Sequence, residues 1–102
     1  VVSFTHSDFG RTLTSNGDGT DHGWGGHQIV TGGPVNGRQI YGQMPVLEIG
    51  GDDDATGGRI IPTTSVDQYA GTLAEWFGVD TSALDIIAPS LSNFTTSNLG
   101  FV

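Results

Sequence analysis

A short stretch rich in histidine, aspartate and glycine carries the side chains that could bind a divalent metal. Asp21 and His22 are adjacent, and His27 follows five residues after His22. A carboxylate and two imidazoles are ligands that zinc and manganese accept. The glycines between them let the backbone turn sharply, so that neighbouring residues can converge on one ion. The spacing predicts a metal site; the competing interpretation is a glycine-rich loop in which Asp21 caps a turn and His22 makes a local hydrogen bond.

A second pattern of oxygen ligands overlaps the first. Asn16, Asp18 and either Thr20 or Asp21 offer oxygen atoms at alternating positions, as the start of a calcium loop does. The bidentate glutamate that completes an EF-hand loop is missing, so that motif is absent. The same residues form Asn-Gly and Asp-Gly pairs, which are typical of turns without an ion. We favour the turn.

Asp8 and Arg11 follow the first predicted strand. A carboxylate at the C-terminal end of a parallel strand lies where open α/β sheets bind ligands. The planar guanidinium of Arg11 is suited to holding a phosphate or sulfate oxyanion. The simpler alternative is an ion pair between Asp8 and Arg11 that orders the loop.

The composition narrows the class of partner. The 102 residues include 3 Lys plus Arg, 11 Asp plus Glu and no cysteine, with a formal net charge of −8. Binding to duplex nucleic acid needs many cationic side chains that contact phosphate. An anionic membrane surface repels a chain with a large net negative charge. No apolar run approaches the roughly 20 residues that span a bilayer. We therefore expect no nucleic-acid partner, no membrane partner and no thiol chemistry.

Short strands and connecting loops are predicted to position these residues. Val1–Thr5 is predicted to be a buried strand, because it is apolar and β-branched. Residues 6 to 26 have almost no hydrophobic periodicity and are predicted to be a loop. Further strands are predicted at Gln28–Thr31, Arg38–Tyr41 and Val46–Ile49, with an acidic surface loop at Gly50–Gly58.

The most regular pattern predicts a helix between Ser65 and Gly78. Ser65 and Gln68 form a capping box, apolar residues recur in one stripe, and Gly78 suits a left-handed C-terminal cap. A shorter helical turn is predicted at Thr81–Ile87. The fold class is therefore α/β: a small, partly open sheet of short strands with one main packing helix and glycine-rich loops, in a single domain over residues 1–102.

Three segments, in this order, resemble the C-terminal portion of the DUF1501 family: Phe4–Thr12, Gly19–Gly26 and Pro62–Tyr69. Members of that family are exported bacterial proteins, several times longer than this chain, grouped with the alkaline phosphatase and sulfatase superfamily. The resemblance implies a piece of a longer protein, a fragment of an alkaline phosphatase-like fold, and a periplasmic or extracellular location.

The superfamily comparison implies specific residues. Sulfatase-like proteins commonly carry a Ser-Asp-His-Gly metal turn, which Ser7–Gly10 matches except that Phe9 replaces the histidine. Thr20–Gly23 then restores a carboxylate–imidazole pair downstream. Ser65–Asp67, Thr72–Leu73 and Gly78–Val79 match a helix of the superfamily. The metal ligands implied are Asp8, Asp21 and His22, joined by His27.

The resemblance implies hydrolysis of phosphate, sulfate or related esters with a divalent metal, whether zinc, manganese or calcium. A metal would polarise the ester oxygen and neutralise charge in the transition state. Arg11 and His22 are the predicted catalytic residues, acting on a small anionic ester, with Arg11 as the anion contact. The nucleophile of such enzymes comes from the N-terminal half of the fold, and this chain has no counterpart to it.

Two other interpretations of the sequence remain open. The first is a non-catalytic exported binding or structural unit, stabilised by calcium in its acidic loops. The second is a homo-oligomer, because a truncated α/β sheet exposes strand edges that invite pairing with another chain.

Overall fold

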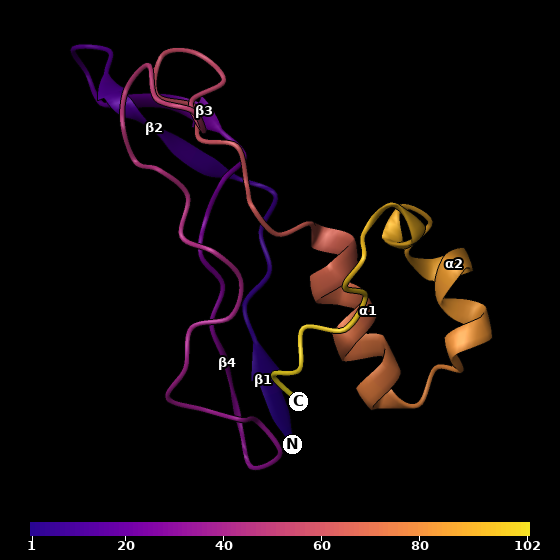
Figure 1. The fold of residues 1–102 in the computed structure, drawn as a ribbon. Helices are drawn as coiled ribbons and strands as arrows, with labels where there is room; N and C mark the ends of the chain where they lie inside the picture. The colour runs from indigo at the N-terminus through magenta and orange to yellow at the C-terminus, as the bar shows by residue number, and fades with distance from the viewer. The chain divides into compact units, whose positions relative to one another are not determined.

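The computed structural model describes all 102 residues (Figure 1). Four strands come first: β1 (Val2–Phe4), β2 (Gly10–Ser15), β3 (Thr20–Gly23) and β4 (Val30–Gly32). The helices follow: α1 (Val66–Phe77), α2 (Leu84–Ile87) and two short 3-10 turns, η1 (Thr81–Ala83) and η2 (Leu91–Asn93). The strands form two two-stranded sheets, β1 with β4 and β2 with β3. The predicted small α/β fold with short strands and one main helix is confirmed.

The chain divides into two compact units. The first unit comprises Val1–Val2, Thr31–Gly42 and Thr64–Val102, and it contains the helices. The second unit comprises Ser3–Val30 and Gln43–Thr63, and it contains the β2–β3 hairpin. The single-domain organisation stays a prediction.

In the first unit, α1 begins and ends where the sequence predicts. The Ser65 hydroxyl accepts hydrogen bonds from two first-turn N–H groups at 3.0 and 3.2 Å. The Gln68 side-chain oxygen accepts one from the Ser65 N–H at 3.0 Å, which completes the capping box. Gly78 has φ 107° and closes the helix in the left-handed conformation. The predicted turn at Thr81–Ile87 is also present, as η1 and α2.

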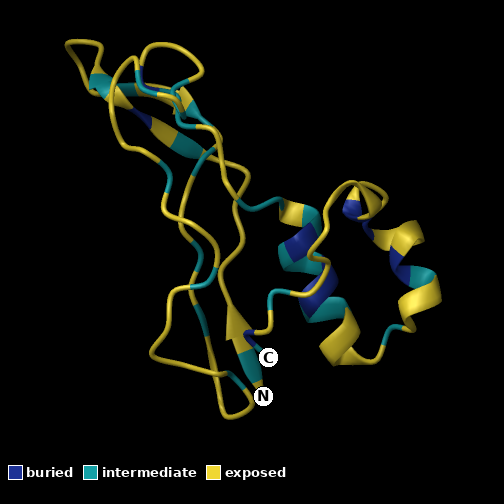
Figure 2. Cartoon of the chain, in the orientation of Figure 1, coloured by how far each residue is buried: buried dark blue, intermediate teal, exposed yellow.

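The face that α1 buries differs from the predicted apolar stripe. Its buried residues are Gln68, Gly71 and Thr72, whereas Phe77 in the last turn is 83% exposed. Gly71 faces the Leu91 side chain, which a Cβ at Gly71 would approach to 3.2 Å. The buried hydrophobic residues of the whole chain are few, and all lie in the first unit: Leu84, Ala88, Leu91 and Phe101 (Figure 2).

Polar bonds fasten the C-terminal tail to α1. Thr72, fully buried, donates its hydroxyl to the Gln68 carbonyl at 2.7 Å and accepts the Leu99 N–H at 2.9 Å. The Gln68 amide donates to the Thr96 carbonyl at 2.7 Å. This polar face of α1 can therefore be buried, because each of its buried polar side chains has a hydrogen-bond partner.

We expect Ser65→Ala to lower the free energy of unfolding of the first unit by about 1 kcal/mol, because two helix N–H groups lose their acceptor. Ser90→Ala is the matched control, since Ser90 precedes η2 but its side chain caps nothing. Urea denaturation followed by circular dichroism measures both. Equal losses in the two variants would contradict a specific capping role.

In the second unit, an antiparallel hairpin replaces the predicted loop over residues 6 to 26. β2 pairs with β3 around a turn in which the Asn16 N–H donates to the Gly19 carbonyl at 3.0 Å. The prediction was wrong because only Thr12 of this hairpin is buried, so its strands carry no hydrophobic alternation. Their pairing rests on backbone hydrogen bonds and on the Asn-Gly-Asp-Gly turn.

Other strand predictions met mixed outcomes. β1 forms within Val1–Thr5, but it is not buried, and Val1 is 99% exposed. β4 overlaps the predicted strand at Gln28–Thr31. No strand forms at Arg38–Tyr41, where Arg38 adopts φ 63°, or at Val46–Ile49, where the Val46 N–H donates to the Asp53 carboxylate at 2.7 Å.

Candidate functional site

The β2–β3 hairpin carries most of the residues with potential chemistry. Arg11 lies directly opposite His22, with Gly10 opposite Gly23 on one side. The ladder is irregular between Arg11 and Ser15. Residues directly opposite one another in an antiparallel pair project to the same face of the sheet. Arg11 and His22 therefore share one face of the hairpin.

An aromatic ring joins Arg11 and His22 on that face. The Phe9 ring contacts the His22 imidazole edge-on, with centroids 5.0 Å apart and an interplanar angle of 62°. The Arg11 guanidinium carbon lies 4.8 Å from the centre of the same ring, within reach of a cation–π interaction. One Arg11 nitrogen, Nη1, also donates to the Thr20 carbonyl at 2.9 Å. The predicted ion pair with Asp8 does not form; Arg11 is positioned by Phe9 and by the backbone of β3 instead.

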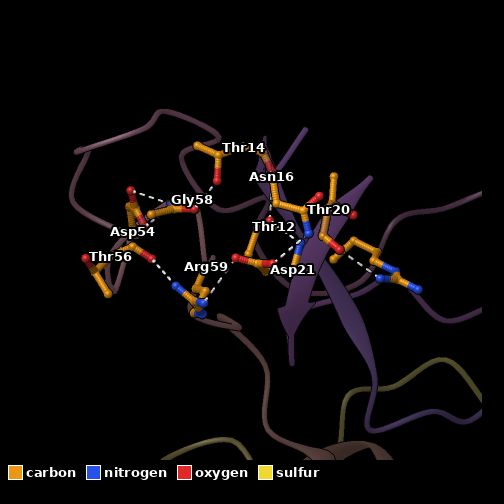
Figure 3. Close-up of polar contacts among 11 residues, drawn as sticks. Thr12, Thr14, Asn16, Thr20, Asp21, Asp54, Thr56, Gly58 and Arg59 are labelled. Atoms are coloured by element: carbon orange, nitrogen blue, oxygen red, sulfur yellow. Dashed lines mark hydrogen bonds and ion pairs between the residues drawn. The ribbon is translucent and has the colours of Figure 1, made fainter. Parts of the chain in front are cut away.

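Asp21 projects to the opposite face, because successive strand residues alternate. Its Oδ1 accepts a hydrogen bond from Asn16 Nδ2 at 2.8 Å, and its Oδ2 lies 3.8 Å from Arg59 Nη2 (Figure 3). Its backbone N–H donates to the Thr12 hydroxyl at 3.1 Å. Both carboxylate oxygens of Asp21 thus have partners from the chain itself.

The acidic loop at Gly50–Gly58 supports this second face. The Asp54 carboxylate accepts N–H groups of Gly50 at 2.8 Å and Gly58 at 2.9 and 3.0 Å. The N–H of Gly50, followed by that of Gly58 and its neighbours, lowers the pKa of Asp54 below its usual range. The Gly58 carbonyl accepts the Leu13 N–H at 2.9 Å, which ties the loop to β2. Asp54 therefore organises the loop that presents Arg59 to Asp21.

Hydrogen bonds within the chain stabilise the turn at Asn16–Gly19. Asn16 Oδ1 accepts the Asp18 N–H at 3.0 Å, and the Gly17 N–H donates to the Ser15 hydroxyl at 3.1 Å. Gly17 has φ 93°, a conformation that glycine adopts without strain. This geometry is that of the polar turn favoured from the sequence.

The remaining predicted metal ligands, Asp8 and His27, are not gathered with Asp21 and His22. Asp8 is exposed and makes no hydrogen bond or ion pair. The His27 ring nitrogen Nε2 lies 3.4 Å from the sulfur of Met44. No group of three or more His, Asp or Glu side chains is placed to hold a metal ion. The structure therefore does not assemble Asp8, Asp21, His22 and His27 into one ligand set.

Three partners were missed in the sequence. In the sequence Phe9 stands out only as a departure from a motif, yet its ring contacts both Arg11 and His22. Arg59, which pairs with Asp21, carried one usable signal: it is one of only three cationic side chains in the chain. Met44 had no signal, because its contact with His27 depends on the tertiary fold.

A comparison with protein families matches residues 1–84 to the family described as "Protein of unknown function (DUF1501)". The chain belongs to the DUF1501 family. The DUF1501 match covers the hairpin, the acidic loop and α1, and it extends to Leu84 at the start of α2. The match confirms the family that the sequence resembles, whereas the C-terminal position and the superfamily stay predictions.

No curated protein and no solved structure matches the chain. Among its helices, none combines the length and the apolar character needed to cross a lipid bilayer.

Proposed function

We propose that this DUF1501 chain is the C-terminal portion of a hydrolase of phosphate or sulfate esters, related to the alkaline phosphatase and sulfatase superfamily. The observation that carries the proposal is the cross-strand pairing of Arg11 with His22. It joins a fixed cation and an imidazole on one face of a hairpin. An exported, periplasmic or extracellular, location is part of the same proposal.

Arg11 is the proposed contact for the ester's oxyanion. A guanidinium has five N–H donors in a planar fork, and Arg11 uses Nη1 for the Thr20 carbonyl. The other donors suit two oxygens of a phosphate or sulfate group. The Phe9 ring and the Thr20 carbonyl restrict the orientation of the guanidinium, so that less order must be imposed when the anion binds.

His22 is the proposed carrier of a proton. An imidazole beside a bound ester can donate a proton to the leaving oxygen or accept one from water. The edge contact with Phe9 holds the ring on the same face as Arg11. In this proposal the nucleophile comes from the N-terminal half of the longer protein.

The implied divalent metal does not fit a complete site within this chain. Asp21 and His22 project to opposite faces of β3, and the Asp21 oxygens are engaged by Asn16 and Arg59. No three candidate ligands gather. The steps assigned to Arg11 and His22 therefore do not pass through zinc, manganese or calcium.

A second candidate function is a non-catalytic exported binding or structural unit. The engagement of Asp21 by Asn16 and Arg59 favours it, since a side chain with these partners serves to join β3 to the acidic loop. This candidate is distinguished by anion binding, since it predicts that neither inorganic phosphate nor inorganic sulfate binds at Arg11, whereas the hydrolase proposal predicts that both do. Light scattering tests the associated expectation of a homo-oligomer.

We expect Arg11→Gln to weaken the binding of inorganic phosphate and sulfate by about tenfold or more, because a charge-assisted contact is lost. Each anion is titrated into the ¹⁵N-labelled chain, and NMR measures the affinity of the chain for that anion. Arg38→Gln is the matched control, because it removes the same charge from an exposed position in the first unit.

The proposal fails if the unaltered chain binds neither anion, or if the two arginine variants weaken binding equally. Resonances of residues 9 to 23 should shift in the unaltered chain. Shifts confined to other residues would also overturn the assignment of Arg11.

A further inference from the structure

His27 and Met44 bring two soft ligand atoms together in the second unit. His27 lies between β3 and β4, and Met44 lies on the segment that follows Gly42. The distance from His27 Nε2 to Met44 Sδ is 3.4 Å. The two residues are 17 positions apart, so the contact is tertiary.

Both side chains are open to the surroundings. His27 is exposed, and Met44 is 61% exposed. Methionine usually fills gaps in a hydrophobic core, where its flexible thioether packs without strain. Here the thioether instead lies at the surface against an imidazole nitrogen, where an ion could reach both atoms.

The chemistry of this pair selects a particular class of ion. Thioether sulfur is a soft ligand that favours monovalent copper, and imidazole also binds copper well. Calcium and manganese prefer carboxylate and carbonyl oxygens, and the contact that holds His27 is to sulfur rather than to a carboxylate. The pair therefore differs in kind from the carboxylate-rich set that the sequence suggested for His27.

The separation of the two atoms suits a bridging ion. If a metal lay about 2.0 Å from the nitrogen and about 2.3 Å from the sulfur, the 3.4 Å separation of the two atoms would give an N–metal–S angle of roughly 105°, near the tetrahedral value. The ion would take the place of a proton on Nε2, and the rotatable methionine side chain allows small adjustments.

We propose that His27 and Met44 form a binding site for monovalent copper. The site uses neither Arg11 nor His22, so it goes beyond the proposed ester hydrolysis and does not depend on it. External ligands such as water or chloride complete the coordination of the ion.

The sequence makes a direct test possible. The chain contains no cysteine and one methionine, so Met44 carries its only sulfur atom. The purified chain is loaded with monovalent copper under reducing, oxygen-free conditions, using ascorbate rather than a thiol. X-ray absorption should then show one sulfur neighbour at about 2.3 Å from the copper. Selenomethionine labelling should replace that sulfur signal with a copper–selenium signal.

Affinity is measured by competition with a chromophoric copper(I) chelator. Met44→Leu keeps the shape and removes the sulfur, and His27→Gln removes the imidazole. Each is expected to weaken copper(I) binding about tenfold or more. His6, the third histidine of the chain, lies outside both proposed sites. His6→Gln is therefore the control and should leave the affinity within about twofold. Circular dichroism establishes that all variants fold alike.

Zinc provides the discriminating comparison. The proposal is supported if copper(I) binds more tightly than zinc and loses affinity in Met44→Leu. It is overturned if the absorption data show no sulfur or selenium neighbour. It is also overturned if Met44→Leu binds copper(I) as well as the unaltered chain does, because an imidazole-only site would then account for the binding.

Discussion

Gly10→Ala is expected to destabilise the second unit by about 2–3 kcal/mol, because it places a methyl group where backbone atoms already lie. A Cβ at Gly10 would sit 2.0 Å from the Gly25 carbonyl oxygen. Gly25 is itself confined, since a Cβ there would lie 2.7 Å from the Ile60 carbonyl oxygen. Three backbone segments thus approach closely at these two glycines, and a methyl group at either would meet backbone atoms rather than a flexible side chain.

Gly26→Ala is the control for this substitution, in the same unit. The nearest atom to a Cβ at Gly26 would be the Phe9 carbonyl oxygen, at an ordinary contact distance of 3.8 Å, and Gly26 has no positive φ. Alanine there should change the free energy of unfolding by no more than about 0.5 kcal/mol. Urea denaturation of a Trp76→Phe background, followed by Trp24 fluorescence, reports on the second unit. Equal stability of the Gly10 and Gly26 variants would show that the close approach carries no energetic weight.

Thr72→Val is expected to destabilise the first unit by about 2 kcal/mol. The substitution keeps the shape of the side chain but removes the hydroxyl that accepts the Leu99 N–H at 2.9 Å. Thr72 is fully buried, so no water replaces the lost acceptor. The C-terminal tail, which contains Leu99, would lose one of its hydrogen bonds to α1.

Thr72→Ser separates the hydrogen bond from the packing. Serine retains the hydroxyl and loses one methyl group, so its cost should be about 1 kcal/mol and smaller than that of valine. Unfolding of a Trp24→Phe background, followed by Trp76 fluorescence, measures the first unit. A serine variant less stable than the valine variant would mean that the methyl contact, rather than the Leu99 bond, holds the tail.

The helix α1 could be predicted because its signals are local. Ser65, Gln68 and Gly78 act on backbone groups within a few residues of themselves, and the structure uses each as the sequence indicates. The face that α1 buries could not be predicted in the same way. Thr72 and Gln68 are buried because the tail offers them partners, and those partners lie far along the chain.

The hairpin shows the limit of hydrophobic periodicity. β2 and β3 have mostly exposed or half-buried residues, so the pattern that usually marks a strand is absent. The Asn-Gly-Asp-Gly letters at residues 16 to 19 predict a turn, and the structure forms it. A turn of this type commonly joins two paired strands, as it does here.

The grouping of the candidate site residues depends on whether residues 20 to 23 form a loop or a strand. Adjacent residues of a loop can converge on one ion, whereas adjacent residues of a strand point to opposite faces. Once residues 20 to 23 are a strand, Asp21 and His22 separate. His22 then joins Arg11, and Asp21 joins Arg59. The residues were found from the sequence, but their grouping required the strand.

The small set of buried apolar side chains has a thermodynamic consequence. The heat capacity change of unfolding comes mainly from apolar surface that becomes hydrated. Leu84, Ala88, Leu91 and Phe101 supply little of it, and the second unit has no fully buried apolar side chain. The curve of stability against temperature should accordingly be shallow, with little curvature between cold and heat.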